Sequence, residues 1–175
     1  MRALGLLVVF ALLAPGCKSK STPAPMQAWK GAVESVTHAG KNVGSGFEIC
    51  DDASCHPAAA GDKVPSGARL KTDGRTRARI ALDDGSKLVL DRDSDIALVA
   101  KTPRTAHLAR GAASISAVAS AKLEMSGAYV EGSDARFDAI ADGVAARVSV
   151  AHGTVQVRAT GQQKDAPSTS VLSGE

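Results

Sequence analysis

Polar and apolar residues alternate along Arg75–Leu82, the most regular stretch of the chain. The basic residues Arg75, Arg77 and Arg79 occupy every second position, and small or apolar residues stand between them. Successive side chains of a β-strand point to opposite faces. This spacing therefore predicts a strand with one basic face and one apolar face.

A glycine-containing turn follows this strand and leads into a second apolar segment. A three-residue loop in which Gly85 takes the left-handed conformation sets Ile80 opposite Leu88 and Ala78 opposite Leu90. This register keeps the apolar residues of both segments on the same face. The pattern therefore predicts an antiparallel hairpin.

Valine recurs at alternate positions on both sides of a glycine near the C-terminus. A two-residue turn that ends at Gly153 sets Val150 opposite Val155 and Val148 opposite Val157. We therefore predict a second hairpin in this region, with its valines on one face.

The remaining segments also favour strands. After residue 28, no stretch combines an apolar helical stripe with capping residues. The segment Ala112–Ala121 is rich in serine and alanine and carries β-branched residues. It predicts a strand with Ala113, Ile115 and Ala117 on one face.

The spacing of turns and the composition indicate an all-β fold. Asp-Gly and similar turn signals recur at intervals of about 8–12 residues, which is typical of many-stranded β domains. Aromatic residues make up only 3% of the chain, and a thin stack of strands closes well on valine, alanine and leucine. We predict an elongated, solenoid-like stack of short antiparallel strands and hairpins, with a β-sandwich as the alternative.

The N-terminus has the layout of an export signal. Arg2 precedes an apolar run of 12 residues that ends at Ala14, which is too short to cross a bilayer as a stable helix. The junction before Cys17 resembles a bacterial lipobox, in which the cysteine receives diacylglycerol and cleavage occurs before it. This resemblance implies a signal peptide at residues 1–16 and lipidation of Cys17. The alternative is a soluble secreted protein in which Cys17 is incidental.

The chain has three cysteines. If Cys17 carries lipid, Cys50 and Cys55 remain as a close pair, and an oxidising periplasm favours a disulfide between them. The alternative is a metal or redox pair, but the spacing is not Cys-x-x-Cys and no second pair exists, so we expect no metal site. Residues 17–28 would then be the lipidated cysteine and a flexible tether, because serine, threonine and proline dominate residues 18–27.

The charge balance and the missing motifs argue against several functions. The chain has 21 Lys and Arg against 18 Asp and Glu, a net charge of +3, which is too mild to indicate nucleic-acid binding. It contains no Gly-x-Ser-x-Gly elbow, His-Glu-x-x-His helix or phosphate-binding loop. The acidic run Asp91–Asp95 imitates the start of a calcium loop, but Ile96 stands where an EF-hand needs glycine. We therefore expect no enzymatic activity and no cofactor.

A series of short motifs from residue 61 onward resembles the FecR family. They are a Gly-Asp-x-Val start, single Gly and Thr positions, two apolar strands around an Asp-Gly-Ser turn, a Ser turn, a Leu-x-x-Gly strand, a Gly-x-x-Phe segment, a late valine-rich hairpin and a closing Leu-x-x-Gly-Glu. They are found here at Gly61–Val64, Gly67, Thr72, Ile80–Leu82, Asp84, Gly85, Ser86, Leu88–Leu90, Ser94, Leu108–Gly111, Gly132–Phe137, Val148–Val157 and Leu172–Glu175. The resemblance covers residues 61–175, and we assign residues 29–175 to one FecR-like β domain.

This resemblance implies an elongated, all-β, solenoid-like module exposed to the periplasm. The best-known members of the family relay a signal from an outer-membrane transporter to a cytoplasmic sigma factor. No cytoplasmic segment precedes the apolar run here, and that run has the layout of a cleaved signal. What carries over is therefore the sensing or docking module, anchored from the periplasmic side.

Together, these observations predict a non-enzymatic cell-envelope lipoprotein with a FecR-like sensing or protein-interaction module that acts in envelope signalling. The alternative is a structural or glycan-binding envelope component. We expect attachment to the periplasmic side of the outer membrane rather than the inner one, and an envelope protein as partner.

The basic face formed by Arg75, Arg77 and Arg79 is the candidate partner-binding surface. It suits an acidic protein, an anionic glycan or a lipid phosphate. The alternative is that these arginines protect an exposed strand from aggregation.

Overall fold

The computed structural model of the chain describes residues 28–38, 41–42, 46–100, 104–160, 169–172 and 174. These residues form sixteen β-strands and include no helix, so the all-β prediction is confirmed. Within the same residues no helix is long and apolar enough to cross a membrane. The predicted signal peptide, Cys17 and most of the tether lie outside the described part.

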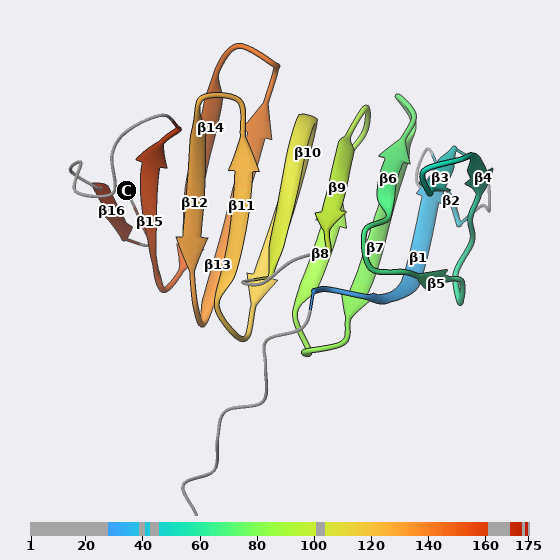
Figure 1. Cartoon of the computed structure of the whole chain (residues 1–175), viewed down its shortest axis with the longest axis horizontal. Helices are drawn as coiled ribbons and strands as arrows, with labels where there is room; N and C mark the ends of the chain where they lie inside the picture. The colour runs from blue at the N-terminus through green and yellow to red at the C-terminus, as the bar shows by residue number, and fades with distance from the viewer. Residues whose placement is uncertain are drawn as a thin grey trace, which may run out of the picture.

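The strands form one continuous hydrogen-bonded sheet that folds into two facing layers (Figure 1). Sheet A consists of β14 (Ala146–His152), β13 (Ala135–Ala141), part of β10 (Thr105–Ala117), β8 (Lys87–Leu90), β7 (Thr76–Leu82), β1 (Gly31–His38), β2 (Lys41–Asn42) and β5 (Lys63–Val64). Sheet B consists of β16 (Thr169–Leu172), β15 (Thr154–Ala159), β12 (Ala128–Gly132), β11 (Ala121–Met125), the rest of β10, β9 (Asp95–Val99), β6 (Arg69–Thr72), β3 (Phe47–Cys50) and β4 (Cys55–Pro57).

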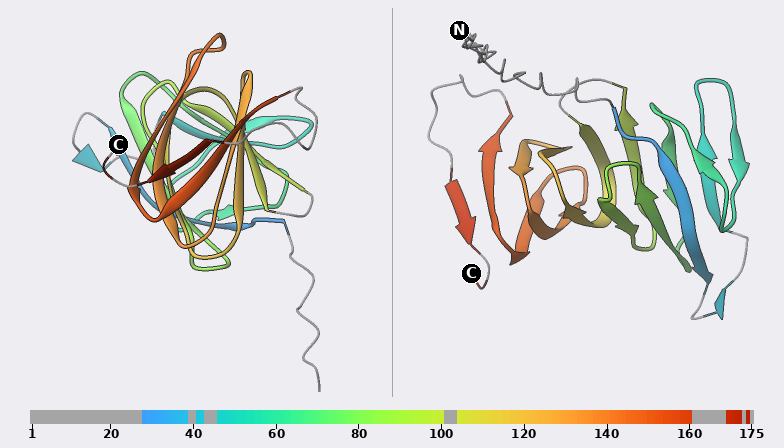
Figure 2. Two further views of the ribbon diagram at one scale, coloured as in Figure 1. Left: turned by 90° about the vertical axis from the view of Figure 1, so that its left-hand side faces the viewer. Right: turned by 90° about the horizontal axis from the view of Figure 1, so that it is seen from below.

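The chain winds between the two layers as it advances along the molecule. It crosses from sheet B to sheet A between β6 and β7, returns between β8 and β9, and crosses again between β12 and β13. The result is an elongated stack in which the colour of the chain changes steadily from one end to the other (Figures 1 and 2). This winding is the predicted solenoid-like arrangement.

The long strand β10 connects the two layers. Its first half pairs with β9 and with β11 in sheet B, whereas its second half pairs with β8 and β13 in sheet A. The strand turns from one layer to the other at Gly111, whose φ of 89° lies in the left-handed region that favours glycine. The β10–β11 pair is parallel, whereas the other strand pairs of the described part are antiparallel.

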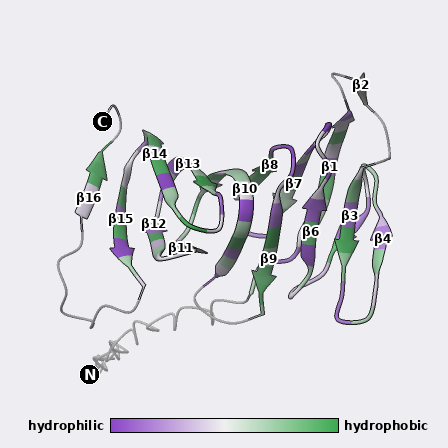
Figure 3. Cartoon of the chain, turned by 90° about the horizontal axis from the view of Figure 1, so that it is seen from above, coloured by the Kyte–Doolittle hydropathy of each residue, from purple (hydrophilic) through white to green (hydrophobic). Residues whose placement is uncertain are grey.

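The core lies between the layers and is built mainly from alternating small and branched side chains. Figure 3 shows apolar and polar residues alternating along β10, as a strand with one buried face requires. Ala113, Ile115 and Ala117 are all buried, which confirms their predicted common face. The core also takes in the large side chains of Trp29, Phe47 and Phe137, among others.

The first predicted hairpin is confirmed. Strands β7 and β8 pair with Ile80 opposite Leu88 and Ala78 opposite Leu90. Gly85 has a φ of 84°, the left-handed conformation that the three-residue loop requires. The apolar residues of both strands consequently face the core.

The second predicted hairpin is wrong. β14 pairs with β13, and β15 pairs with β12 and β16, so Val148 and Val150 do not face Val155 and Val157 as a hydrogen-bonded pair. The chain crosses from sheet A to sheet B at Gly153. Alternating valines point inward both in a hairpin and in such an arch, so the pattern cannot separate the two.

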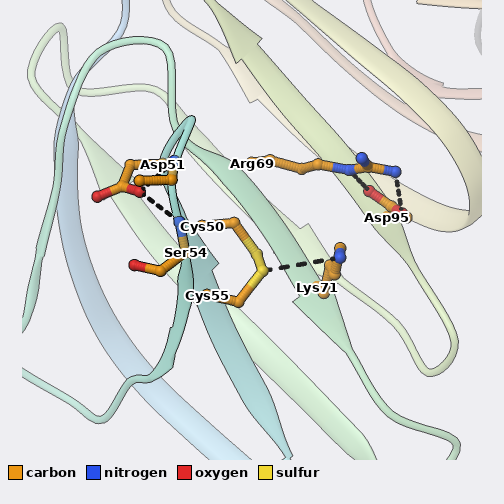
Figure 4. The surroundings of a disulfide bond; sticks show 8 residues. Cys50, Asp51, Ser54, Cys55, Arg69, Lys71 and Asp95 are labelled. Atoms are coloured by element: carbon orange, nitrogen blue, oxygen red, sulfur yellow. Dashed lines mark hydrogen bonds and ion pairs between the residues drawn. A yellow bond between two sulfur atoms is a disulfide. The ribbon is translucent and has the colours of Figure 1, made fainter.

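The predicted disulfide between Cys50 and Cys55 is present and joins β3 to β4 at one end of sheet B (Figure 4). The turn between the cysteines is closed by the Asp51 carboxylate, which accepts hydrogen bonds from the backbone N–H groups of Ala53 and Ser54. Because β4 has only three residues, the covalent link holds a strand that hydrogen bonds alone would hold weakly.

We predict that Gly111→Ala destabilises the protein far more than Gly143→Ala. Both glycines have a left-handed φ, near 90°, so each alanine costs about 1–3 kcal/mol of backbone strain. A Cβ on Gly111 would also lie 2.5 Å from the Cα of Ser94, whereas a Cβ on Gly143 meets nothing within 4 Å. Urea denaturation followed by circular dichroism measures both losses, and equal losses would contradict close packing at the β10 corner.

Candidate partner-binding surface

The FecR-like Asp-Gly-Ser motif forms a structural turn in which the Asp84 carboxylate and the Ser86 hydroxyl are largely shielded from solvent. The Asp84 carboxylate accepts hydrogen bonds from the Ser86 backbone N–H at 2.9 Å and from the Trp29 indole N–H at 3.1 Å. The Ser86 hydroxyl in turn accepts a hydrogen bond from the Val118 backbone N–H at 3.0 Å. The motif therefore ties the β7–β8 turn to two segments that are distant along the chain.

The other family positions act in the same way at the corner of β10. The Ser94 hydroxyl accepts a hydrogen bond from the backbone N–H of Ala112 at 3.0 Å. It also donates a hydrogen bond to the backbone carbonyl of Ala112 at 2.9 Å. The Thr72 hydroxyl accepts the Ser94 backbone N–H at 3.0 Å and donates to the Asp91 carbonyl. Both side chains are buried, so these bonds satisfy backbone groups that water cannot reach.

Arg104 supports the Asp-Gly-Ser turn and is not among the residues predicted from the sequence. Its guanidinium Nη1 lies 2.6 Å from a carboxylate oxygen of Asp84 and 3.4 Å from one of Asp83. Burial raises the pKa of the Asp84 carboxyl, but the hydrogen bonds from Ser86 and Trp29, together with the Arg104 charge, outweigh it and hold the pKa below its ordinary value of 3.8.

An open groove of about 510 Å³ lies on the outer face of sheet A. Its floor consists of the small outward residues of the central strands, such as Ala112 and Ser114 on β10, with Val89 on β8. Longer side chains stand on the strands at either side. The alternation that buries one face of each strand therefore also builds this hollow on the other face.

The predicted arginines form one wall of this groove. Arg77 and Arg79 are exposed on β7 and line the groove, whereas Arg75 lies in the turn before the strand and does not. Arg77 forms an ion pair with Asp91, with Nε 2.6 Å from Oδ1. Arg79 forms no ion pair with any residue that the structure describes. Of the three, Arg79 is therefore the cation best placed to meet a partner.

The Arg77–Asp91 pair sets the charge of this wall. The Arg77 guanidinium, more than any other group, lowers the pKa of the Asp91 carboxyl, so the carboxylate stays ionised and neutralises the arginine. Both side chains are well exposed, at 57% and 41%, so the pair adds little stability. It does fix the orientation of Arg77 along the groove.

The opposite wall comes from β13, and the sequence analysis did not single it out. Asp138 lies across the floor from Arg79. Arg79 pairs with Val89 on β8, Val89 pairs with Ser114 on β10, and Ser114 pairs with Asp138, so the four residues form one row across the sheet. Ile140 stands beside Asp138 and is 48% exposed. The alternation of polar and apolar residues in β13 was a readable signal, but it could not show which strand lies next to β10.

One set of metal-type groups lies close together in the described part of the chain: Glu48, Cys50 and Cys55. The two cysteines are joined as a disulfide, and thiolates are the form of cysteine that binds metals. The Lys71 ammonium also lies 3.8 Å from the Cys55 sulfur (Figure 4). This cluster is therefore not a cation site in the oxidised protein.

Comparison with protein families identifies the family to which the chain belongs. The model of the FecR protein family matches residues 68–156, just over half of the 175 residues. The chain belongs to the FecR family. A comparison with curated proteins finds no match.

Two crystal structures share the fold. They are of a protein from Parabacteroides distasonis ATCC 8503 that is provisionally described as an anti-sigma factor, at 1.65 and 2.50 Å resolution. The TM-score is 0.51 in both cases, with 17% and 16% sequence identity, and each alignment covers 60% of this chain. It covers 51% of that protein, so this chain spans about half of its length. At this identity the likeness shows the fold alone.

We predict that the protein loses stability in acid, below about pH 4. The carboxyl groups of Asp51, Asp73, Asp84, Asp91 and Asp142 all have pKa values below the ordinary 3.8. A lowered folded-state pKa stabilises the protein above the unfolded-state pKa, and this contribution disappears as the pH falls through the folded-state value. The unfolding free energy should therefore be level from pH 7 to about pH 5 and should fall below about pH 4.

Asp84→Asn should reduce the steepness of this acid loss, because Asp84 is only 9% exposed and accepts buried hydrogen bonds. Asp138→Asn is the matched control, since Asp138 is exposed and accepts no hydrogen bond within the described residues. Urea denaturation between pH 2 and pH 7 measures both. An Asp84→Asn profile identical to that of the wild type would contradict the assignment.

Proposed function

We propose that this chain is a non-enzymatic regulatory module of the cell envelope that acts by binding a protein partner in the groove on sheet A. Membership of the FecR family supports a regulatory role. The observation that carries the proposal is the groove itself, with a free cation at Arg79 on one wall and the Asp138 carboxylate on the other. Such paired charges select and orient a partner more than they strengthen its binding.

The lining of the groove favours a polypeptide over a substrate or a sugar. It contains no histidine, cysteine or lysine beside its serines, and of its two carboxylates Asp91 is held in an ion pair with Arg77. It also contains no aromatic ring, and carbohydrate binding commonly depends on ring stacking. Among the described aromatic residues, Trp29, Phe47 and Phe137 are buried, and Tyr129 lies on sheet B under the Lys122 ammonium.

The proposed location is the periplasmic side of the outer membrane. Residues 1–16 would be the export signal, Cys17 the lipidated residue and residues 18–27 the tether. The sequence pattern at this junction and the family of the domain support this arrangement. At about 3 Å per residue, an extended tether would place the domain on the order of 30 Å from the membrane surface, where it could sense or dock an envelope protein.

We predict that Cys17→Ser abolishes lipidation and releases the protein from membranes. Cells fed an alkyne-labelled fatty acid should label the wild type and should not label the variant, because the thiol is the proposed attachment atom. The double variant Cys50→Ser/Cys55→Ser is the matched control and should keep the label, since those sulfurs form the disulfide. Labelling of the Cys17→Ser protein would refute the anchor without bearing on the groove.

We predict that Arg79→Glu weakens partner binding about tenfold, the effect expected of one lost charge contact. A photo-crosslinking amino acid at Ser114, on the groove floor, captures a protein that occupies the groove in cells. Arg75→Glu is the matched control, because it makes the same charge change outside the groove. Equal crosslinking yields for wild type and Arg79→Glu would exclude the groove as the docking site. Recovery of polysaccharide in place of protein would favour a structural or glycan-binding role.

A further inference from the structure

The two layers end at different places at the C-terminal end of the stack. In sheet A the last described strand is β14, which pairs with β13 on one side only. Sheet B continues through β15 to β16, and in Figure 1 both strands lie farther out than β14. Within the described residues no strand pairs with the outer edge of β14 in sheet A, and β16 of the facing sheet B lies close to this strand.

The core is incompletely covered at this same end. The apolar residues that pack against the core yet stay only partly buried are Ala146, Val148, Val157 and Val171. They belong to β14, β15 and β16, so all of them lie at this end of the stack. Further apolar side chains beside β14 would remove their remaining surface from water.

Among the described residues, the unpaired edge of β14 is seven residues long, whereas β16, the last strand of sheet B, has four. β14 has seven residues and contains no proline. At the opposite end, β4 has three residues, includes Pro57 and is held by the disulfide, and β2 and β5 have two residues each. Short strands and proline discourage strand addition, whereas a long unprotected edge invites it.

We propose that β14 is a strand-addition site that binds one extended segment of a partner protein. The segment would hydrogen-bond along Ala146–His152 and place alternate valine, isoleucine or threonine side chains over Val157 and Val171. Its outward positions would carry a carboxylate opposite Arg147, which is exposed on β14 and forms no ion pair with any described residue. This chemistry defines an acidic-apolar alternating peptide as the ligand.

The shape of the C-terminal end of the stack favours a single added strand, and not a second copy of this chain, as the occupant of the β14 edge. A copy that paired through its own β14 would bring its β15 and β16 beneath that strand. Those positions are already occupied by β15 and β16 of the first molecule. A single extended segment brings no second layer with it, so it can pair with β14 without meeting β15 and β16. The inference goes beyond the proposed function, because it concerns an edge of the sheet and not the groove.

The test is a selection of seven-residue peptides against the purified protein, from a library with Val, Ile or Thr at alternate positions and polar residues between them. Selected peptides should protect the backbone amides of β14 from hydrogen exchange and should carry Asp or Glu opposite Arg147. Binding should be about tenfold weaker in Val148→Lys, because an inward charge at a sheet edge opposes pairing. Val144→Lys is the matched control: Val144 is 90% exposed in the β13–β14 turn, and its peptide affinity should equal that of the wild type.

Arg147→Glu keeps the proposal testable if Val148→Lys fails to fold, because residue 147 points to solvent. This variant should select Lys or Arg where the wild type selects an acid. The proposal is overturned if no peptide is enriched, or if the selected peptides bind Val148→Lys and the wild type equally. Self-association of the wild type that is lost in Val148→Lys would overturn the assigned occupant in favour of a second copy.

Discussion

The stacking of chain corners between the two layers is the contact on which the rest of the structure depends. The β6–β7 corner, the β8–β9 corner and the bend of β10 lie one upon another, joined by hydrogen bonds from the Asp93 backbone N–H to the Asp73 carbonyl and from the Asp91 N–H to the Ala112 carbonyl. The buried hydroxyls of Thr72 and Ser94 complete this stack. Because each corner moves the chain from one layer to the other, their alignment sets the register of both sheets at once.

This corner stack explains why the family motif is spread along the chain as single residues. Glycine at 111 permits close approach, and Ser94 and Thr72 supply hydroxyls for backbone groups that the crossing would leave unsatisfied. Asp84 and Ser86 serve the β7–β8 turn in the same way. Family membership therefore reports on how the solenoid is built. Binding properties lie instead in the surfaces built on this frame, such as the walls of the groove.

The two candidate surfaces share a cause in the same architecture. The outward residues of β10 at the groove, Ala112 and Ser114, are small and form its floor, and the longer residues of β7 and β13 stand as walls. Within the described residues, the edge at β14 is unpaired because the winding ends with more strands in sheet B than in sheet A. Both surfaces suit extended polypeptide, in keeping with the proposed function.

The sequence by itself determined the all-β character of the chain, the Gly85 hairpin, the common buried face of Ala113, Ile115 and Ala117, and the Cys50–Cys55 disulfide, because these depend on neighbours close along the chain. Only the tertiary structure decided the partners of β14 and β15. Their valines point inward in a hairpin and in an arch alike, and the choice follows from contacts with β13 and β12. The same holds for the groove. The sequence predicts that Arg77 and Arg79 share one face of a strand. The pairing of Arg77 with Asp91 and the position of Asp138 opposite Arg79 depend on the order of the strands. Side-chain periodicity is a local property, whereas strand order is set by the packing of the whole core.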